Sequence, residues 1–165
     1  MFRLGIVGHR YFSDGKTALF VAEQCSEILR QIREEHSDLV AISAIAEGAD
    51  TLFAEAALKL NLPLEIVRPF ENYANDFATT SARRRYKKLQ EAARKESRLG
   101  HVTRSDSAYK AAMDWIIDRS DVVVIVWNGQ PAQGSGGTGD AVKKVISQNR
   151  PWVHVDVERF IVTFH

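Results

Sequence analysis

Short apolar runs alternate along this chain with longer segments in which apolar residues recur every three or four positions. Runs of strand length occur at residues 2–7, 39–46, 64–67, 122–127, 151–155 and 160–164. The segments between most of them have the periodicity of amphipathic helices, most clearly residues 16–35 and 51–60. The connections are long enough for crossover helices. We therefore expect an α/β fold with a mostly parallel sheet covered on both faces, to which residues 160–164 add an edge strand.

One part of the chain, residues 71–107, breaks this regular pattern. Between residues 83 and 98 it carries eight basic side chains against two acidic ones, Glu91 and Glu96. The simplest interpretation of such a run is the solvated face of a polar helix. A mobile flap over a phosphate is the second interpretation, and a contact to nucleic acid is the third.

The segment from Asp121 to Val142 joins an apolar run, a glycine-rich loop and a helical pattern. Its run 122–127 is wholly apolar and mostly β-branched, as in a strand buried on both faces. Four glycines follow within residues 134–139. Glycines let backbone N–H groups approach a ligand closely, and the first turn of a helix adds unpaired donors and the positive end of its dipole. We therefore expect residues 134–139 to hold a phosphate, with a flexible surface loop as the alternative.

The spacing of these glycines separates the loop from two well-known nucleotide sites. It is neither the phosphate loop of nucleoside triphosphatases nor the glycine motif that follows the first strand of dinucleotide-binding domains. The sequence therefore gives no reason to expect a nucleoside triphosphatase or a dinucleotide-dependent dehydrogenase.

Three further loops are expected beside this one, because ligands of open α/β sheets bind outside the carboxyl ends of the strands. All four loops carry side chains that a simple connection does not require. The candidate binding residues are Gly8, His9, Arg10, Glu47, Gly48, Asp50, Arg68, Asn128, Gly136, Gly137 and Thr138. The two arginines would bind phosphate, and Glu47 would bind ribose hydroxyls.

Each charged candidate also has a structural alternative. Asp50 could instead be the N-cap of the helix that begins at Thr51. His9 could simply hydrogen-bond a neighbouring loop, and Arg68 could form a surface ion pair.

Composition limits the possible functions. At 165 residues the chain has the size of one domain, which we expect to span residues 1–165. The net charge of +1 gives no general attraction for nucleic acid, which is therefore not expected as a partner. The single cysteine, Cys25, excludes an internal disulfide. No cluster of His, Cys or carboxylates has the spacing of a metal site, so no built-in cofactor is expected, although a ligand could bring its own Mg²⁺.

Targeting signals are also not evident. No apolar run reaches the ~18 residues of a membrane span, and the apolar part of the first ten residues is too short for a signal peptide. We therefore expect a cytoplasmic protein without a membrane partner.

Three motifs fall on the predicted loops in order along the chain: Gly5-Ile6-Val7-Gly8-His9-Arg10, then Ile45-Ala46-Glu47-Gly48-Ala49-Asp50, then Trp127-Asn128-Gly129 with Gly136-Gly137-Thr138-Gly139-Asp140. Together they resemble the SLOG superfamily of Rossmann-like domains. This superfamily includes the Lonely Guy phosphoribohydrolases, formerly labelled lysine decarboxylases, and nucleotide-sensing domains of bacterial defence systems.

The resemblance covers nearly the whole chain and carries several implications. It implies a Rossmann-like three-layer sandwich of strand order 3-2-1-4-5. It also implies a nucleotide-derived ligand, such as a nucleoside monophosphate, ADP-ribose or a cyclic form of it, and often a dimer or higher oligomer.

The chain departs from the hydrolase branch of that superfamily at its acidic residue. The branch has the signature P-G-G-x-G-T-x-x-E, in which the acid helps to break an N-glycosidic bond. Here Gly137-Thr138 can be placed on the G-T, but Ala141 stands where the acid would be, and Asp140 lies one position early. The three glycines that the branch carries after its second strand are replaced by Glu47-Gly48. The phosphate loop is thus kept, whereas the hydrolytic acid is lost or moved.

Two hypotheses follow from these residues. The first is a binding module that senses a nucleotide-derived signal and acts through oligomerisation or an effector protein in trans. The second is an enzyme that hydrolyses or transfers the N-glycosidic bond of a nucleotide, like a phosphoribohydrolase or a deoxyribosyltransferase. In the enzyme, Glu47 or Asp140 would stabilise the oxocarbenium-like centre or activate water, and His9 would protonate the leaving base. We favour the binding module.

Overall fold

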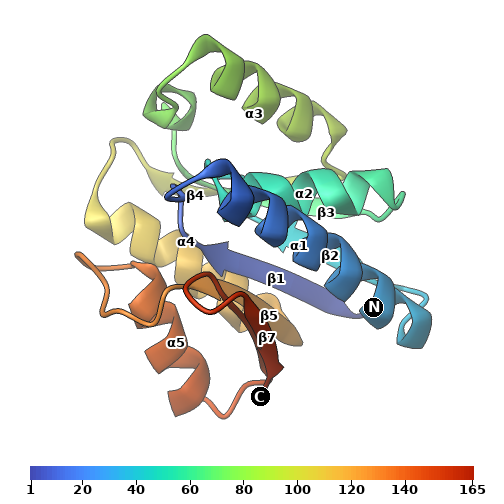
Figure 1. The fold of residues 1–165 in the computed structure, drawn as a ribbon. Helices are drawn as coiled ribbons and strands as arrows, with labels where there is room; N and C mark the ends of the chain where they lie inside the picture. The colour runs from blue at the N-terminus through green and yellow to red at the C-terminus, as the bar shows by residue number, and fades with distance from the viewer.

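A seven-stranded sheet forms the centre of the computed structural model, which describes residues 1–165 (Figure 1). Its order is β4-β3-β2-β1-β5-β6-β7, and all neighbours are parallel except β6 and β7. The strands are β1 Arg3–Gly8, β2 Val40–Ser43, β3 Leu64–Phe70, β4 Lys95–His101, β5 Val122–Trp127, β6 Trp152–Asp156 and β7 Ile161–Phe164. The helices are α1 Gly15–Glu35, α2 Ala49–Lys59, α3 Thr80–Ala92, α4 Asp106–Arg119 and α5 Thr138–Ser147, with a 3-10 turn, η1, at Tyr73–Asp76.

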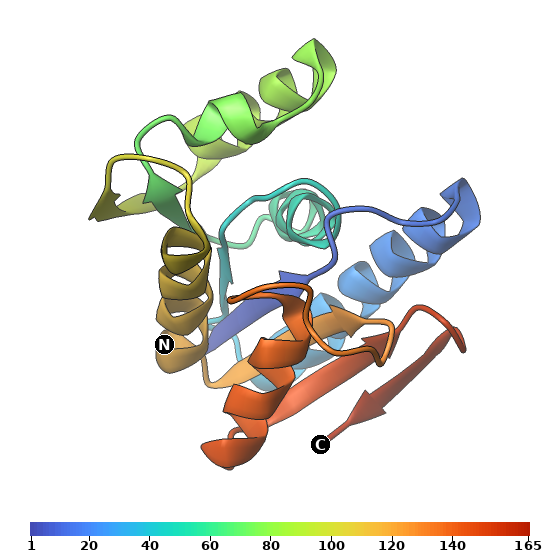
Figure 2. The same cartoon turned by 90° about the vertical axis from the view of Figure 1, so that its left-hand side faces the viewer.

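The sheet separates two layers of helices (Figure 2). Helices α1 and α2 contribute to an apolar cluster of 27 buried residues on one face, and α4 and α5 to a cluster of 14 on the other. Strand β5 contributes side chains to both clusters, because successive side chains of a strand point to opposite faces. Its Val124 and Val126 belong to the first cluster, and its Val123 and Ile125 belong to the second. This double burial explains why the whole run is apolar.

The predicted α/β three-layer architecture and its mostly parallel sheet are confirmed. In chain order the expected strands correspond to β1, β2, β3, β5 and β6, and their spatial order agrees with the predicted 3-2-1-4-5. Residues 160–164 contain the expected edge strand, β7, which pairs antiparallel with β6. One strand was not predicted. Strand β4 lies at the opposite edge of the sheet and pairs with β3.

The basic segment 83–98 is therefore divided between two elements. Its first part belongs to α3, a polar helix as the first interpretation expected, and its last part belongs to β4. No residue of β4 is buried, because it is an edge strand held by its backbone pairing with β3. A strand without a buried face has no apolar alternation in its sequence.

Two helix starts differ from the prediction. Asp14 is the N-cap of α1, and its carboxylate accepts the N–H of Thr17 at 2.8 Å, which begins the helix one residue early. Helix α2 begins at Ala49 with Gly48 as its N-cap. Asp50 thus lies within the first turn of α2, and its interpretation as the N-cap is wrong.

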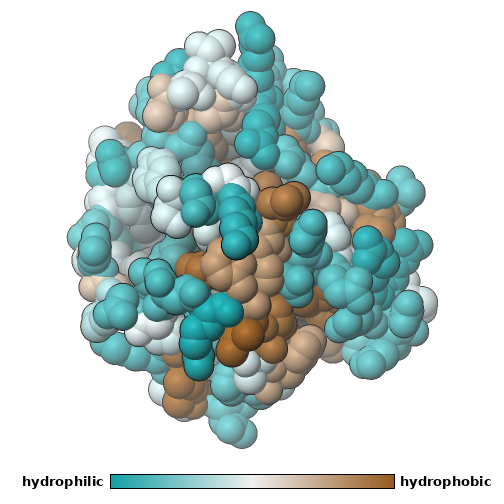
Figure 3. Space-filling view, viewed as in Figure 1, coloured by the Kyte–Doolittle hydropathy of each residue, from teal (hydrophilic) through white to brown (hydrophobic).

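An apolar patch lies on the surface where α1 meets β7 (Figure 3). Leu19 of α1 and Phe164 of β7 are each 60% exposed, and Phe160 packs its ring against Phe20. No helix of the structure has both the length and the hydrophobicity of a membrane span.

Candidate functional site

A pocket of about 730 Å³ opens at the carboxyl end of the sheet. It lies at the neighbouring strands β1 and β5, where the strand order reverses, which is the place expected for ligands of open α/β sheets. Three helices begin at this pocket: α2 contributes Asp50, α4 contributes Asp106 and α5 contributes Thr138. Since the N-terminus of a helix carries partial positive charge, this convergence favours an anionic ligand.

The loop between β5 and α5, residues 128–137, forms one wall of the pocket and is called here the glycine loop. At Gly136 the backbone has a φ of +82°, and a Cβ would lie 2.7 Å from the backbone nitrogen of Lys110. Only glycine fits both requirements, and the loop therefore lies directly on the first turns of α4. The glycines thus serve close packing as well as access to the backbone.

Not every N–H group of the glycine loop is free. The N–H of Gly136 donates to Asp140 Oδ2 at 3.2 Å, so a carboxylate of α5 already occupies this donor. Helix α5 has Gly137 as its N-cap and no side-chain cap. The N–H groups of Gly137 and Thr138 donate to no acceptor within the chain. These two donors, at the positive end of α5, are the best placed to bind an anionic oxygen.

His9 joins the loops around the pocket. Its Nε2 accepts the N–H of Asn128 at 3.0 Å, and its Nδ1 lies 3.4 Å from the hydroxyl of Thr138. Because Nε2 is an acceptor, the ring is neutral with its proton on Nδ1, which can donate to Thr138. Burial lowers the pKa of His9 below its ordinary value and favours this neutral form. Both ring nitrogens are thus engaged in holding β1, the glycine loop and α5 together.

Three residues of the pocket lining, Arg10, Arg104 and Tyr109, surround Asp76, a residue that the sequence did not indicate. Its carboxylate, whose side chain is 4% exposed, pairs with Arg10 at 2.7 Å and with Arg104 at 3.2 Å, and it accepts the hydroxyl of Tyr109. The Arg10 guanidinium also lies 4.4 Å from the centre of the Tyr109 ring. These four residues, the Asp76 cluster, come from the loop after β1, from η1, from the loop between β4 and α4, and from the first turn of α4.

Asp50 is the acidic side chain that is buried within the pocket. Its Oδ2 accepts the N–H of Ala46 at 3.4 Å, and Arg10 is its nearest cationic influence. Burial raises the pKa of this carboxyl to about 7, although the hydrogen bond from Ala46 and the charge of Arg10 oppose the rise. A group that titrates near neutrality within a pocket is a candidate for a functional role.

The structure brings together most of the predicted site residues. Those that line the pocket are Gly8, His9, Arg10, Asp50, Asn128, Gly136, Gly137 and Thr138. The remaining four, Glu47, Gly48, Arg68 and Asp140, lie outside its lining.

Each of these four residues has another place in the structure. Strand β3 continues through Pro69, so Arg68 lies within the strand, and its Nε pairs with Glu96 of β4 at 3.0 Å. At Gly48 a Cβ would lie 2.4 Å from the carbonyl oxygens of His9 and Arg10, so this glycine permits close packing. Glu47 borders a small recess behind Arg10.

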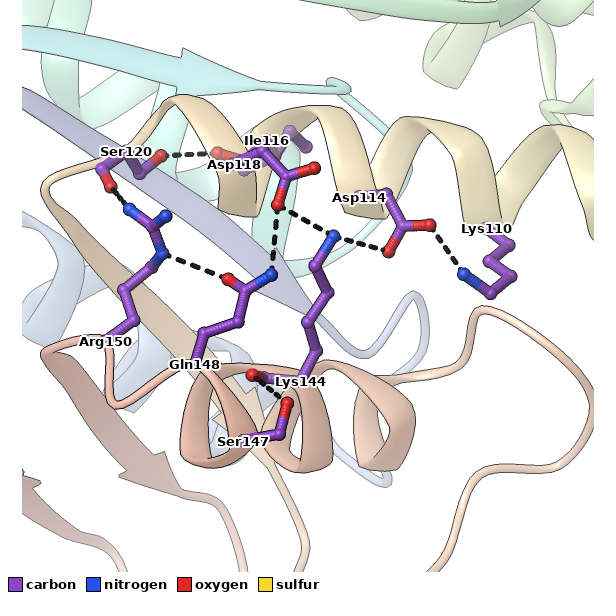
Figure 4. A network of polar contacts seen from close by, with 9 residues as sticks. All are labelled: Lys110, Asp114, Ile116, Asp118, Ser120, Lys144, Ser147, Gln148 and Arg150. Carbon is purple, nitrogen blue, oxygen red and sulfur yellow. Dashed lines mark hydrogen bonds and ion pairs between the residues drawn. The ribbon is translucent and has the colours of Figure 1, made fainter.

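A network of polar side chains fixes α5 against α4 (Figure 4). Lys144 of α5 lies between two carboxylates of α4, at 2.9 Å from Asp114 and 2.8 Å from Asp118. Asp114 also pairs with Lys110, whose backbone supports the glycine loop. Burial alone would raise the pKa of both aspartates, but their hydrogen bonds and the charge of Lys144 outweigh it and lower the pKa. The network thereby helps to hold the start of α5 at the pocket.

Comparisons with known proteins find similarity through the structure alone. No family model matches the sequence, and no curated protein matches it. The structure is similar to DNA processing protein A from Helicobacter pylori, with a TM-score of 0.62 and 18% identity over 93% of this chain and 64% of that one. For DNA processing protein A from Streptococcus pneumoniae the TM-score is 0.65, with 17% identity over 93% and 50% of the two chains. The Moco carrier protein from Chlamydomonas rheinhardtii has a TM-score of 0.54 and 12% identity over 93% and 74%.

One expectation is corrected by these structural similarities. Nucleic acid was not expected as a partner because the net charge is close to zero, but the H. pylori protein, whose chain contains this fold, binds single-stranded DNA. Net charge sums over the whole chain and therefore misses local groups of cations, such as those of α3. The predicted homo-oligomer and effector protein stay predictions.

The extent of these similarities limits what they establish. This chain spans about half to two thirds of the length of the two DNA processing proteins, and all three identities are below 20%. Such a likeness shows the fold alone: the chain has the Rossmann-like α/β fold of these proteins.

Proposed function

We propose that this chain is a binding module for a nucleotide, whose phosphate is held at the start of α5. One observation carries the proposal: α5 opens into the pocket with a glycine N-cap and two N–H groups, those of Gly137 and Thr138, that have no acceptor in the chain. By contrast, Asp14, Thr79 and Ser105 cap α1, α3 and α4 with their side chains. Helix α2 also has a glycine N-cap, but the N–H of its first residue, Ala49, donates to the carbonyl of His9. An uncapped helix start in a pocket is suited to a phosphate.

The rest of the pocket fits the sugar and base of a nucleotide. Its volume is in the range of small-molecule sites, roughly 300–1,000 Å³. Apolar residues of α4, among them Met113 and Ile116, offer a surface for a base. Asn128 and Asp50 offer polar groups for hydroxyls or the edge of a base.

Binding is favoured over cleavage of an N-glycosidic bond by the positions of the three proposed catalytic residues. Glu47 lies outside the pocket lining, and the carboxylate of Asp140 accepts the N–H of Gly136. Both nitrogens of His9 are engaged. A general acid or base needs access to the reacting atoms. Glu47 is not placed for it, and Asp140 and His9 would have to give up these contacts.

Calorimetric titration with nucleoside 5′-monophosphates tests the proposal. A matched pair of variants, Thr138→Val at the pocket and Thr163→Val on β7, removes one hydroxyl each at constant shape. Thr138 is 8% exposed and lies at the proposed phosphate, whereas Thr163 is exposed and outside the pocket lining. We expect Thr138→Val to weaken binding about tenfold, in line with ~1–1.5 kcal/mol for one hydrogen bond, and Thr163→Val to leave it unchanged.

The outcomes against the proposal are clear. Equal affinities of the two variants would exclude a contact between the phosphate and the Thr138 hydroxyl, and no binding of any monophosphate would refute the proposal. Chromatography of the same mixtures detects free base, whose release by the wild type would establish the enzyme instead.

Single-stranded DNA is a second candidate, favoured by an aromatic side chain at the pocket mouth. Tyr11 lines the pocket and is 70% exposed, which leaves its ring free to stack on a base. The similarity to the single-stranded-DNA-binding protein of H. pylori supports the same ligand. Fluorescence anisotropy with a labelled oligo-dT tests it. We expect Tyr11→Ala to weaken oligonucleotide binding about tenfold or more, and an unchanged affinity would exclude this role of the ring.

A further inference from the structure

The Asp76 cluster has more positive than negative charge at the pocket wall. Two guanidinium groups, of Arg10 and Arg104, share the single carboxylate of Asp76. The carboxylate is buried, whereas the side chains of Arg10 and Arg104 are 29% and 69% exposed. The negative charge thus lies behind the arginines, and the net positive charge faces the pocket.

Both arginines keep hydrogen-bond donors that Asp76 does not use. A guanidinium carries five N–H donors, and each arginine gives one nitrogen to Asp76. Arg10 is held further by the ring of Tyr109, and Arg104 lies 5.9 Å from the centre of the same ring. The buried carboxylate of Asp76 and the partly buried ring of Tyr109 therefore fix the position of two cations that keep donors for a ligand. Such an arrangement binds phosphate oxygens well.

This wall is separate in the chain from the proposed phosphate site at the start of α5, yet both line the same pocket. We propose that Arg10 and Arg104 form a second anion subsite, so that the pocket takes a nucleotide with two phosphate groups. The inference rests on the proposed function, in which the first phosphate lies at Gly137 and Thr138. Asp76 is the positioning residue of this subsite, because it contacts both arginines.

Affinities for ligands with one and two phosphate positions test the second subsite. The probes are adenosine 5′-monophosphate, adenosine 5′-diphosphate and adenosine 3′,5′-bisphosphate, measured by calorimetry at low salt. We expect the wild type to bind at least one of the two-phosphate probes tenfold or more tightly than the monophosphate. This preference should fall as salt is raised, since it arises from charge.

Two arginine variants then locate the subsite. Arg104→Gln removes an exposed cation of the cluster, and Arg84→Gln removes an exposed cation of α3 that forms no ion pair in the structure. We expect Arg104→Gln to abolish the preference, so that its affinity for the two-phosphate probe falls to its affinity for the monophosphate. Arg84→Gln should change neither value. Both side chains are solvent-exposed, so neither variant should disturb the fold.

The possible failures are distinguishable. A wild type that binds the monophosphate without any preference for the other probes overturns the second subsite and leaves the proposed function intact. A preference that survives in Arg104→Gln also overturns the subsite. If the wild type binds none of the three probes, both the proposed function and this inference are refuted.

Discussion

Replacing Asp50 by asparagine should stabilise the protein increasingly as the pH rises. Asp50 is 6% exposed, and its carboxylate accepts one hydrogen bond, of 3.4 Å, from the N–H of Ala46. Burial raises the pKa of this carboxyl from 3.8 to about 7. The folded protein therefore binds a proton at Asp50 more tightly than the unfolded chain does.

The sign and size of the effect follow from this difference in pKa. Protonated Asp50 makes its full contribution to stability at a pH below the pKa that this carboxyl has in the unfolded chain. The contribution is lost as the pH rises through about 7. At ~1.4 kcal/mol for each pH unit, the loss by pH 8 is on the order of 4 kcal/mol. Asparagine has a similar shape and never ionises. The difference in free energy of unfolding between Asp50→Asn and the wild type should therefore rise by this amount, in favour of the variant, between about pH 4 and pH 8.

Urea unfolding of both proteins at pH 4.5, 6 and 8 measures the effect, and Asp156→Asn supplies a control of opposite sign. Asp156 is also buried, but hydrogen bonds from Arg159 and the N–H of Glu158 outweigh its burial and lower its pKa. Its contribution is present at neutral pH and lost in acid, so Asp156→Asn should be less stable than the wild type at pH 8. A difference between Asp50→Asn and the wild type that does not change with pH would refute the reasoning.

Three further substitutions test separate parts of the site. Lys144→Met should lower the free energy of unfolding by about 1 kcal/mol at neutral pH, because partly exposed ion pairs contribute little, and urea unfolding should show the difference shrinking in acid as the aspartates of α4 are protonated. Asp106→Asn, which removes a negative charge from the pocket, should strengthen nucleotide binding severalfold in calorimetry; weaker binding would contradict this. Ser43→Ala should cost about 1–3 kcal/mol in urea unfolding, since the buried N–H of Ile45 loses its acceptor, and a loss below 0.5 kcal/mol would contradict it.

The sequence was sufficient to predict the core of the sheet because buried strands have a distinctive composition. The run 122–127 packs against helices on both faces, and therefore every position in it is apolar. Strand β4 has no such requirement, and its sequence, Lys-Glu-Ser-Arg-Leu-Gly-His, resembles a solvated loop. Its place at the edge is determined by pairing with β3, which depends on tertiary structure.

The sequence was sufficient to predict the site residues that directly follow the end of a strand. It did not indicate the site residues that lie elsewhere in the chain. Residues after β1 and β5, such as His9 and Asn128, lie at the pocket because the strands themselves direct them there. Arg68 was misplaced, because β3 continues to Phe70, three residues past the expected run 64–67. Asp76 and Arg104 come from the irregular segment 71–107, whose position over the pocket depends on the packing of η1 and α4. No local pattern in the sequence marks them.

The turn between β2 and α2 connects the stability of the fold with the chemistry of the pocket. Ile45 has a φ of +46°, a conformation that is strained for a β-branched residue. It persists because its side chain is 1% exposed and its N–H donates to Ser43 Oγ at 2.9 Å. The same turn directs Ala46 so that its N–H reaches Asp50 and its carbonyl accepts the hydroxyl of Thr51 at 2.7 Å. The strained turn therefore helps to place the titratable carboxyl of Asp50 in the pocket.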